Sequence, residues 1–238
     1  MDIDDPVLNE NLTYGSPKIF ERRRRILETA RLLIAERGYD GFGIRELCER
    51  ASVAPQTVYK AFESKERIIA LAIRHHFQLF TKQQAYHFDK ASLEGVIERL
   101  IRSDRNMTNM REFVGAIVAI HFSNTSDEDL KLATRANITS TLRPWVVALR
   151  EGGYLRSGVN PVDFTNSIVA LLFYVSLEWC RGAISDEDFI FRKLEALLVY
   201  SAGACRGAGL KQVNMYLNDL MGRRVKFDEI RQAIGSTS

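Results

Sequence analysis

The sequence predicts an all-α fold, and three observations support this. Apolar residues recur at the three- and four-residue spacing of amphipathic helices along most of the 238 residues. Ser, Asn or Pro stands before most of these stretches, as expected at helix N-termini. No stretch alternates apolar and polar residues in the manner of a half-buried strand.

Composition excludes several protein classes. Charged residues make up 26% and hydrophobic residues 46%, which are ordinary values for a globular chain. The longest unbroken apolar run, Ile168–Val175, has eight residues, whereas a membrane helix needs about 20. Three widely spaced cysteines, Cys48, Cys180 and Cys205, argue against a disulfide framework and favour a reducing cytoplasm. The acidic N-terminus lacks the apolar centre of a secretory signal, so we expect a cytoplasmic protein with no membrane partner.

Charge is unevenly distributed along the chain. Residues 1–17 hold four acids and no base, and we expect them to form a mobile acidic tail. Residues 18–67 hold twelve bases and eight acids, with the densest run at Arg22–Arg25. Such a run fits a solvated helix face, but a compact basic segment also fits a surface that neutralises phosphates.

Four helices are predicted in the first third of the chain. The first begins at Ser16-Pro17 and ends at Gly38, since proline suits the first helical turn and glycine suits the cap. Pro55 opens the third helix after a short turn, and Ser64 caps a fourth that reaches about Asp89. The second helix has its apolar positions at Ile44, Leu47, Cys48 and Ala51.

The rest of the chain also predicts helices. Pro144 should bend one of them, and Gly203, Gly207 and Gly209 should break another. The expected ranges are 92–105, 109–122, 126–152, 160–182, 185–203 and 210–221, with a last turn at 228–234.

Residues 44–62, IRELCERASVAPQTVYKAF, carry the functional signal. Two short helices joined by a three-residue turn have the spacing of a helix-turn-helix motif. Val58, Ala61 and Phe62 can pack inward. The side chains left facing outward are Gln56, Thr57, Tyr59 and Lys60.

The outward residues have the chemistry of a recognition helix, which places its N-terminal residues in the major groove. Lys60 can pair with phosphate or guanine, and Gln56 with adenine. The hydroxyls of Thr57 and Tyr59 suit phosphate oxygens. Tyr59 can also serve as a packing residue on the first helix.

Residues 21–74 resemble the TetR/AcrR family of bacterial transcription regulators, through ILETA, AERGYDGF, IRELCERASV, TVYKAF and SKERI in that order. The resemblance implies a three-helix DNA-binding head over 18–66. It also implies a helical ligand-binding and dimerisation body over 67–238, and a homodimer. Contacts to double-stranded operator DNA are implied for Thr57, Tyr59 and Lys60, and phosphate contacts for Lys65 and Arg45.

The chain departs from the family pattern at three places. Phe42-Gly43 stands where a hydroxyl residue usually precedes the second helix. Ala54 replaces the usual Ser cap, whose loss typically costs about 1 kcal/mol. Pro55-Gln56 replaces the common Lys-Gly and joins the candidate DNA contacts. These changes affect the expected operator sequence and leave the binding mode unchanged.

The body is expected to hold a cavity and a dimer interface. Ile168–Val175 is apolar all round, which implies burial on more than one side. A bundle formed by 161–181 and 186–203 of two subunits would provide this, although an intramolecular core would also do so. Candidate contacts to a small, partly apolar effector, which can equally be ordinary core residues, are His76, Phe80, Tyr86, Phe113, Ile117, His121, Trp145, Tyr174 and Glu178.

Metal and catalytic chemistry find no support in the sequence. The four histidines form neither an HExxH motif nor a Cys/His cluster, and no phosphate loop or nucleophile motif is present. We therefore expect no cofactor. From the motif and the family resemblance, we expect a homodimeric repressor that a small ligand releases from a near-palindromic operator. The alternatives are a regulator whose body binds a protein, or a small-molecule enzyme with a vestigial head.

Overall fold

The structure, a computed structural model, describes residues 6–9, 16–222 and 232. Every named element among these residues is an α-helix, so the all-α fold class is confirmed. The described residues group into two compact units. Unit 1 comprises Met1–Gln84 and Glu112–Asn137, and unit 2 comprises Ala85–Arg111 and Ile138–Ser238.

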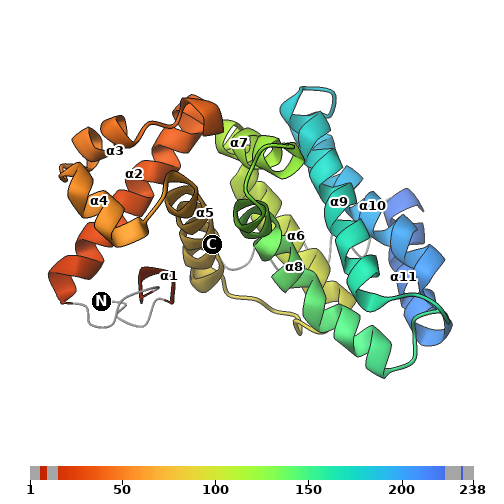
Figure 1. The fold of residues 1–238 in the computed structure, drawn as a ribbon. Helices are drawn as coiled ribbons and strands as arrows, with labels where there is room; N and C mark the ends of the chain where they lie inside the picture. The colour runs from red at the N-terminus through yellow and green to blue at the C-terminus, as the bar shows by residue number, and fades with distance from the viewer. Residues whose placement is uncertain (1–5, 10–15, 223–231, 233–238) are drawn as a thin grey trace. The chain divides into compact units, whose positions relative to one another are not determined.

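Unit 1 contains the helix-turn-helix motif. Helices α1 and α3 pack against α2, and α2 packs along α5 (Figure 1). The helices of this unit are α1 (Pro6–Asn9), α2 (Pro17–Gly41), α3 (Ile44–Ala51), α4 (Pro55–Phe62), α5 (Lys65–Gln83), α7 (Arg111–Phe122) and the first part of α8 (Glu128–Glu151).

The segment expected to be a mobile tail contains α1, whose Val7 and Leu8 are buried. Residues 1–5 and 10–15 of that segment lie outside the described residues. Helix α2 then begins at Pro17, as predicted. Gly38 interrupts it with a φ of 67°, at the position where the sequence predicts its end, although helical residues continue to Gly41.

Two arginines of the Arg22–Arg25 run hold the head together. Arg23 Nη1 donates to the carbonyl of Ala61 at 2.7 Å, and Arg25 Nε donates to the carbonyl of Ala51 at 2.9 Å. Both carbonyls lie at helix C-termini, where a positive charge is favourable. The guanidinium of Arg23 also lies over the Phe62 ring. Half of the basic run therefore joins α2 to α3 and α4.

Helix α5 begins as predicted, since Ser64 Oγ accepts from the amide of Arg67 at 3.0 Å. It ends at Gln83, however, so the predicted end near Asp89 is wrong. The amides of His87 and Phe88 donate instead to the buried Glu98 carboxylate at 3.0–3.1 Å. These amides are satisfied without a helix, which explains why the helix stops early.

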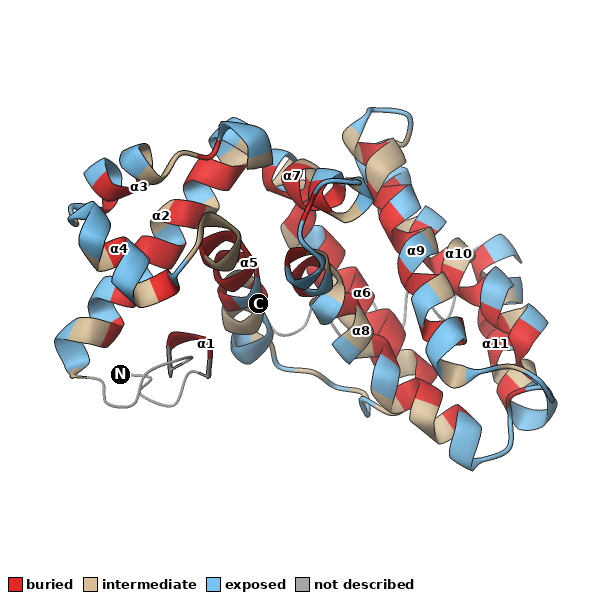
Figure 2. Cartoon of the chain, in the orientation of Figure 1, coloured by how far each residue is buried: buried red, intermediate tan, exposed pale blue. Residues whose placement is uncertain are grey.

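Unit 2 is built around α10, which packs against α6, α9 and α11. Ser92, Asn160 and Ser185 stand where the sequence predicts helices to begin, and each accepts from an amide in the first turn that follows. Buried residues line the inner faces of these helices (Figure 2). The helices are α6 (Leu93–Thr108), the rest of α8, α9 (Pro161–Cys180), α10 (Asp186–Ala204) and α11 (Gly207–Gly222).

The predicted glycine breaks are only partly right. Helix α10 continues through Gly203, and α11 begins at Gly207 and includes Gly209. A side chain at Gly209 would place its Cβ 2.8 Å from Tyr154 Cβ, so this glycine allows close packing instead of ending a helix. Helix α8 likewise runs through Pro144. The turn predicted at 228–234 lies outside the described residues, except for residue 232.

Candidate nucleic-acid interface

Helix α4 presents one polar face to solvent. Val58 and Phe62 are buried, whereas Gln56, Tyr59 and Lys60 are exposed and Thr57 is half-buried. This is the division of faces that the sequence predicts. Tyr59 is 51% exposed, so about half of its surface is accessible to a partner.

The turn between α3 and α4 is tightly defined. Ser52 adopts the left-handed conformation with a φ of 51°, and its amide donates to the carbonyl of Glu49. The amide of Val53 donates to the carbonyl of Cys48 at 3.0 Å. At the start of α4, Ala54 provides no side-chain cap, as expected from its chemistry. The turn is therefore held by backbone bonds, without a side-chain cap at the start of α4.

The two candidate phosphate contacts outside α4 have different surroundings. The Arg45 side chain is 94% exposed, with Glu49 3.5 Å from its Nε. Lys65 Nζ lies 5.1 Å from the Tyr39 ring centre and 5.9 Å from that of Phe42. Phe42 stands where family members usually have a hydroxyl residue before the second helix. Its ring and that of Tyr39 lie beneath this lysine.

Five of the nine candidate effector contacts lie in unit 1. His76 packs edge-on against Phe113, with ring centres 5.3 Å apart. Phe113 and Ile117 are buried, and Phe80 and His121 are half-buried. These contacts are typical of an apolar core.

The other four candidates lie in unit 2 and do not converge on one point. Tyr86 faces Arg99 and Arg102, and Glu178 lies 3.5 Å from Arg181. Tyr174 is exposed and Trp145 is buried.

The described cavities include one of about 870 Å³ in unit 1 and one of about 470 Å³ in unit 2. Of the nine candidates, only Trp145 lines either cavity. The larger cavity is lined by charged and apolar residues from several helices and loops, and such a combination follows no periodic pattern in a sequence.

His76 should make the protein less stable in mild acid. Burial lowers its pKa from 6.5 to about 4, and the charges of Arg31 and His75 act in the same direction. The unfolded chain therefore binds more protons than the folded protein between these two pH values. The resulting stability is fully present above pH 6.5 and is lost as the pH falls towards 4.

A comparison of wild type with His76→Gln tests this. Between pH 7 and pH 5, wild type should lose about 2 kcal/mol more of its free energy of unfolding than the variant loses. Urea denaturation at the two pH values measures the difference. Equal losses in the two proteins would show that His76 does not cause the acid sensitivity.

Neither a metal-binding cluster nor a membrane-spanning helix is found among the described residues. No group of three or more His, Cys, Asp and Glu side chains in this part of the chain is placed to hold a metal ion. None of the helices described is both long enough and apolar enough to cross a membrane.

Comparison with known proteins points to one family. The model of the family described as bacterial regulatory proteins, tetR family, matches residues 26–72, from α2 into α5. The HTH-type transcriptional repressor KstR of Mycolicibacterium smegmatis is 34% identical over 89 residues, 37% of this chain and 41% of that protein. KstR of Rhodococcus jostii is 38% identical over 58 residues, 24% of this chain and 27% of that protein. The chain thus spans less than half the length of these relatives.

Solved structures share the fold over most of the chain. A putative TetR-family regulator from Rhodococcus sp. aligns with a TM-score of 0.58 at 22% identity, covering 76% of this chain and 98% of that one. TylP, a TetR regulator from Streptomyces fradiae, aligns with a TM-score of 0.61 at 16% identity, covering 88% and 97%. The N-terminal helices of the chain match the TetR family of bacterial regulatory proteins, and its fold is shared with solved TetR-family regulators.

Proposed function

We propose that the chain is a transcriptional repressor that binds DNA through α4. The observation that carries this is the exposed row of Gln56, Tyr59 and Lys60 on a helix anchored by buried residues. Its side chains suit base edges and phosphates in a major groove. The relatives that match this region are named as transcriptional repressors. A protein of this kind acts on chromosomal DNA, which fits a cytoplasmic location.

We further infer that the repressor is a homodimer. Val162 and Tyr174 on α9 and Val199 on α10 are 65%, 55% and 52% exposed. These two helices pack side by side, so the chain exposes apolar side chains on both members of one helix pair. A second copy could cover them in a four-helix arrangement. Two heads would then occupy successive major grooves about 34 Å apart on a near-palindromic operator.

We also propose that a small effector controls DNA binding. If the effector prefers a conformation in which the heads are wrongly spaced, effector binding lowers the affinity for DNA. DNA binding then lowers the affinity for the effector by the same factor. Helix α5 supports this coupling, since it continues the chain directly from the turn that ends α4. A cavity in unit 1 that is partly lined by α5 has a volume within the usual range of small-molecule sites.

A titration tests the DNA-binding proposal. The full chain should bind a duplex from the region beside its own gene more tightly than a duplex of shuffled sequence, as measured by fluorescence anisotropy at two salt concentrations. Equal affinity for the two duplexes at both salt concentrations would contradict sequence-specific regulation.

Lys65→Ala should weaken binding to both duplexes by a similar factor. Because its ammonium group is proposed to neutralise one phosphate, the slope of log affinity against log salt should fall by about one. Lys90→Ala, which removes an exposed lysine from unit 2, is the control and should change neither quantity. An effect of Lys65→Ala on the specific duplex alone would show that this lysine reads sequence and does not simply neutralise phosphate.

A further inference from the structure

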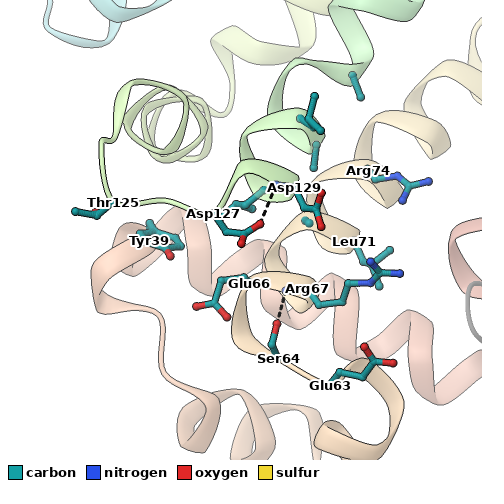
Figure 3. A pocket seen from close by; sticks show the side chains of 15 residues that line it. Tyr39, Glu63, Ser64, Glu66, Arg67, Leu71, Arg74, Thr125, Asp127 and Asp129 are labelled. Atoms are coloured by element: carbon teal, nitrogen blue, oxygen red, sulfur yellow. Dashed lines mark hydrogen bonds between the residues drawn. The ribbon is translucent and has the colours of Figure 1, made fainter.

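Unit 1 contains a cavity of about 870 Å³ beside the end of the recognition helix (Figure 3). Its walls come from the end of α2, the turn between α4 and α5, the first three turns of α5, and the start of α8 with the loop before it. A volume of this size is typical of small-molecule sites. None of the nine effector candidates from the sequence lines it.

The charged residues of the cavity favour a cation. Four carboxylates, from Glu63, Glu66, Asp127 and Asp129, face two guanidinium groups, from Arg67 and Arg74. The acids therefore exceed the bases by two. In Figure 3, Glu66 and Asp127 lie on the same side of the cavity, and both arginines lie on the other.

Tyr39 lies beside this negative side as an uncharged group. Burial raises the pKa of its phenol, and the charges of Glu66, Asp40 and Asp127 raise it further. The phenol therefore stays protonated near neutral pH and leaves the charge of the cavity unchanged. Asp127 Oδ1 accepts from the backbone amide of Asp129 at 2.8 Å, which holds the Asp127 carboxylate at the start of α8.

Most of the remaining lining is apolar. The apolar residues come from α5 and α8 and are Ala70, Leu71, Leu130, Leu132, Ala133 and Ala136. No described group of carboxylates is arranged to hold a metal ion, which favours an organic cation over an inorganic one. The ligand chemistry that fits both parts is a basic amine attached to an apolar group.

We propose that this cavity is an effector site for an apolar amine, lying in unit 1 beside the turn that follows the recognition helix. This deepens the proposed regulatory function and rests on it. Glu63 ends α4 with a φ of 70°, Ser64 caps α5, and both line the cavity. A ligand that contacts both α8 and this turn would hold α4 at a fixed angle to α5. Ligand and DNA must then change each other's affinity by the same factor.

The first experiment measures binding of 4-phenylbutylamine by calorimetry, with 4-phenylbutanol as the uncharged probe. We expect the amine to bind saturably and at least about tenfold more tightly than the alcohol. Glu66→Gln/Asp129→Asn should remove about tenfold or more of the amine's affinity and leave the alcohol unchanged. Glu128→Gln is the matched control, because it removes a carboxylate from the same turn of α8 that does not line the cavity. Thermal unfolding establishes that each variant is folded.

Two calorimetric results would overturn the proposal. One is no saturable binding of the amine at millimolar concentration. The other is equal affinity of the folded double variant and wild type for the amine. Both are independent of DNA, so they can be distinguished from a failure of the proposed repressor function.

The second experiment adds the amine to the full chain bound to its operator. We expect operator affinity to change at least threefold in wild type and in Glu128→Gln, and to stay constant in the double variant. Amine binding without any change in operator affinity would overturn the regulatory role of the site. Failure to bind any DNA specifically would instead overturn the proposed function.

Discussion

Replacing Lys60 with Ala is expected to weaken operator binding by about 10- to 100-fold, or about 1–3 kcal/mol. Lys60 is exposed on α4, beside Tyr59 and one turn beyond Gln56. Its ammonium group can reach guanine acceptors or phosphate in a groove occupied by this helix. The variant should also discriminate less between operators that differ at the base pair facing residue 60.

Competition titrations with single-base operator variants measure both effects. Lys211→Ala is the control, since Lys211 is an exposed lysine on α11 of unit 2. It should bind every duplex as wild type does. If Lys60→Ala bound all duplexes like wild type, the assignment of α4 as the recognition helix would be wrong.

The second large effect concerns a buried ion pair in unit 2. Lys193 Nζ of α10 lies 2.7 Å from Asp104 Oδ1 of α6, and both side chains are 2% exposed. Burial raises the pKa of Asp104, and the charge of Lys193 opposes that rise. The Lys193 ammonium therefore offsets part of the cost of burying this carboxyl group.

Lys193→Met should lower the free energy of unfolding by about 3–5 kcal/mol, because it leaves Asp104 buried without its cation. Lys193→Met/Asp104→Leu removes both charges and should recover most of that loss. Urea denaturation of wild type and both variants measures the difference. A double variant as unstable as Lys193→Met would show that lost packing, and not the unpaired charge, causes the effect.

Local signals in the sequence predicted the fold well. Ser64, Ser92, Asn160 and Ser185 act through amides two or three residues away, so the helix starts at these positions could be recognised and are confirmed. The end of α5 depends on Glu98, which is about ten residues beyond the amides it binds. A contact between residues this far apart cannot be recognised from the spacing of apolar residues along a helix.

The same distinction applies to the candidate sites. The exposed face of α4 follows from the spacing of Val58 and Phe62, so its polar residues could be predicted. Half of the Arg22–Arg25 run, by contrast, binds carbonyls 26 and 38 residues away along the chain. The cavity in unit 1 is similarly assembled from the start of α5 and the start of α8. Only the folded chain brings those residues together.

Selection from a pool of random double-stranded DNA tests the central claim most directly. The full chain should enrich a sequence composed of two inverted half-sites, with centres separated by about 10 base pairs or a multiple of one helical turn. Tyr59→Ala/Lys60→Ala should fail to enrich it. Enrichment of a single half-site would contradict the proposed dimer, and a pool with no enriched sequence would contradict the proposed DNA-binding function.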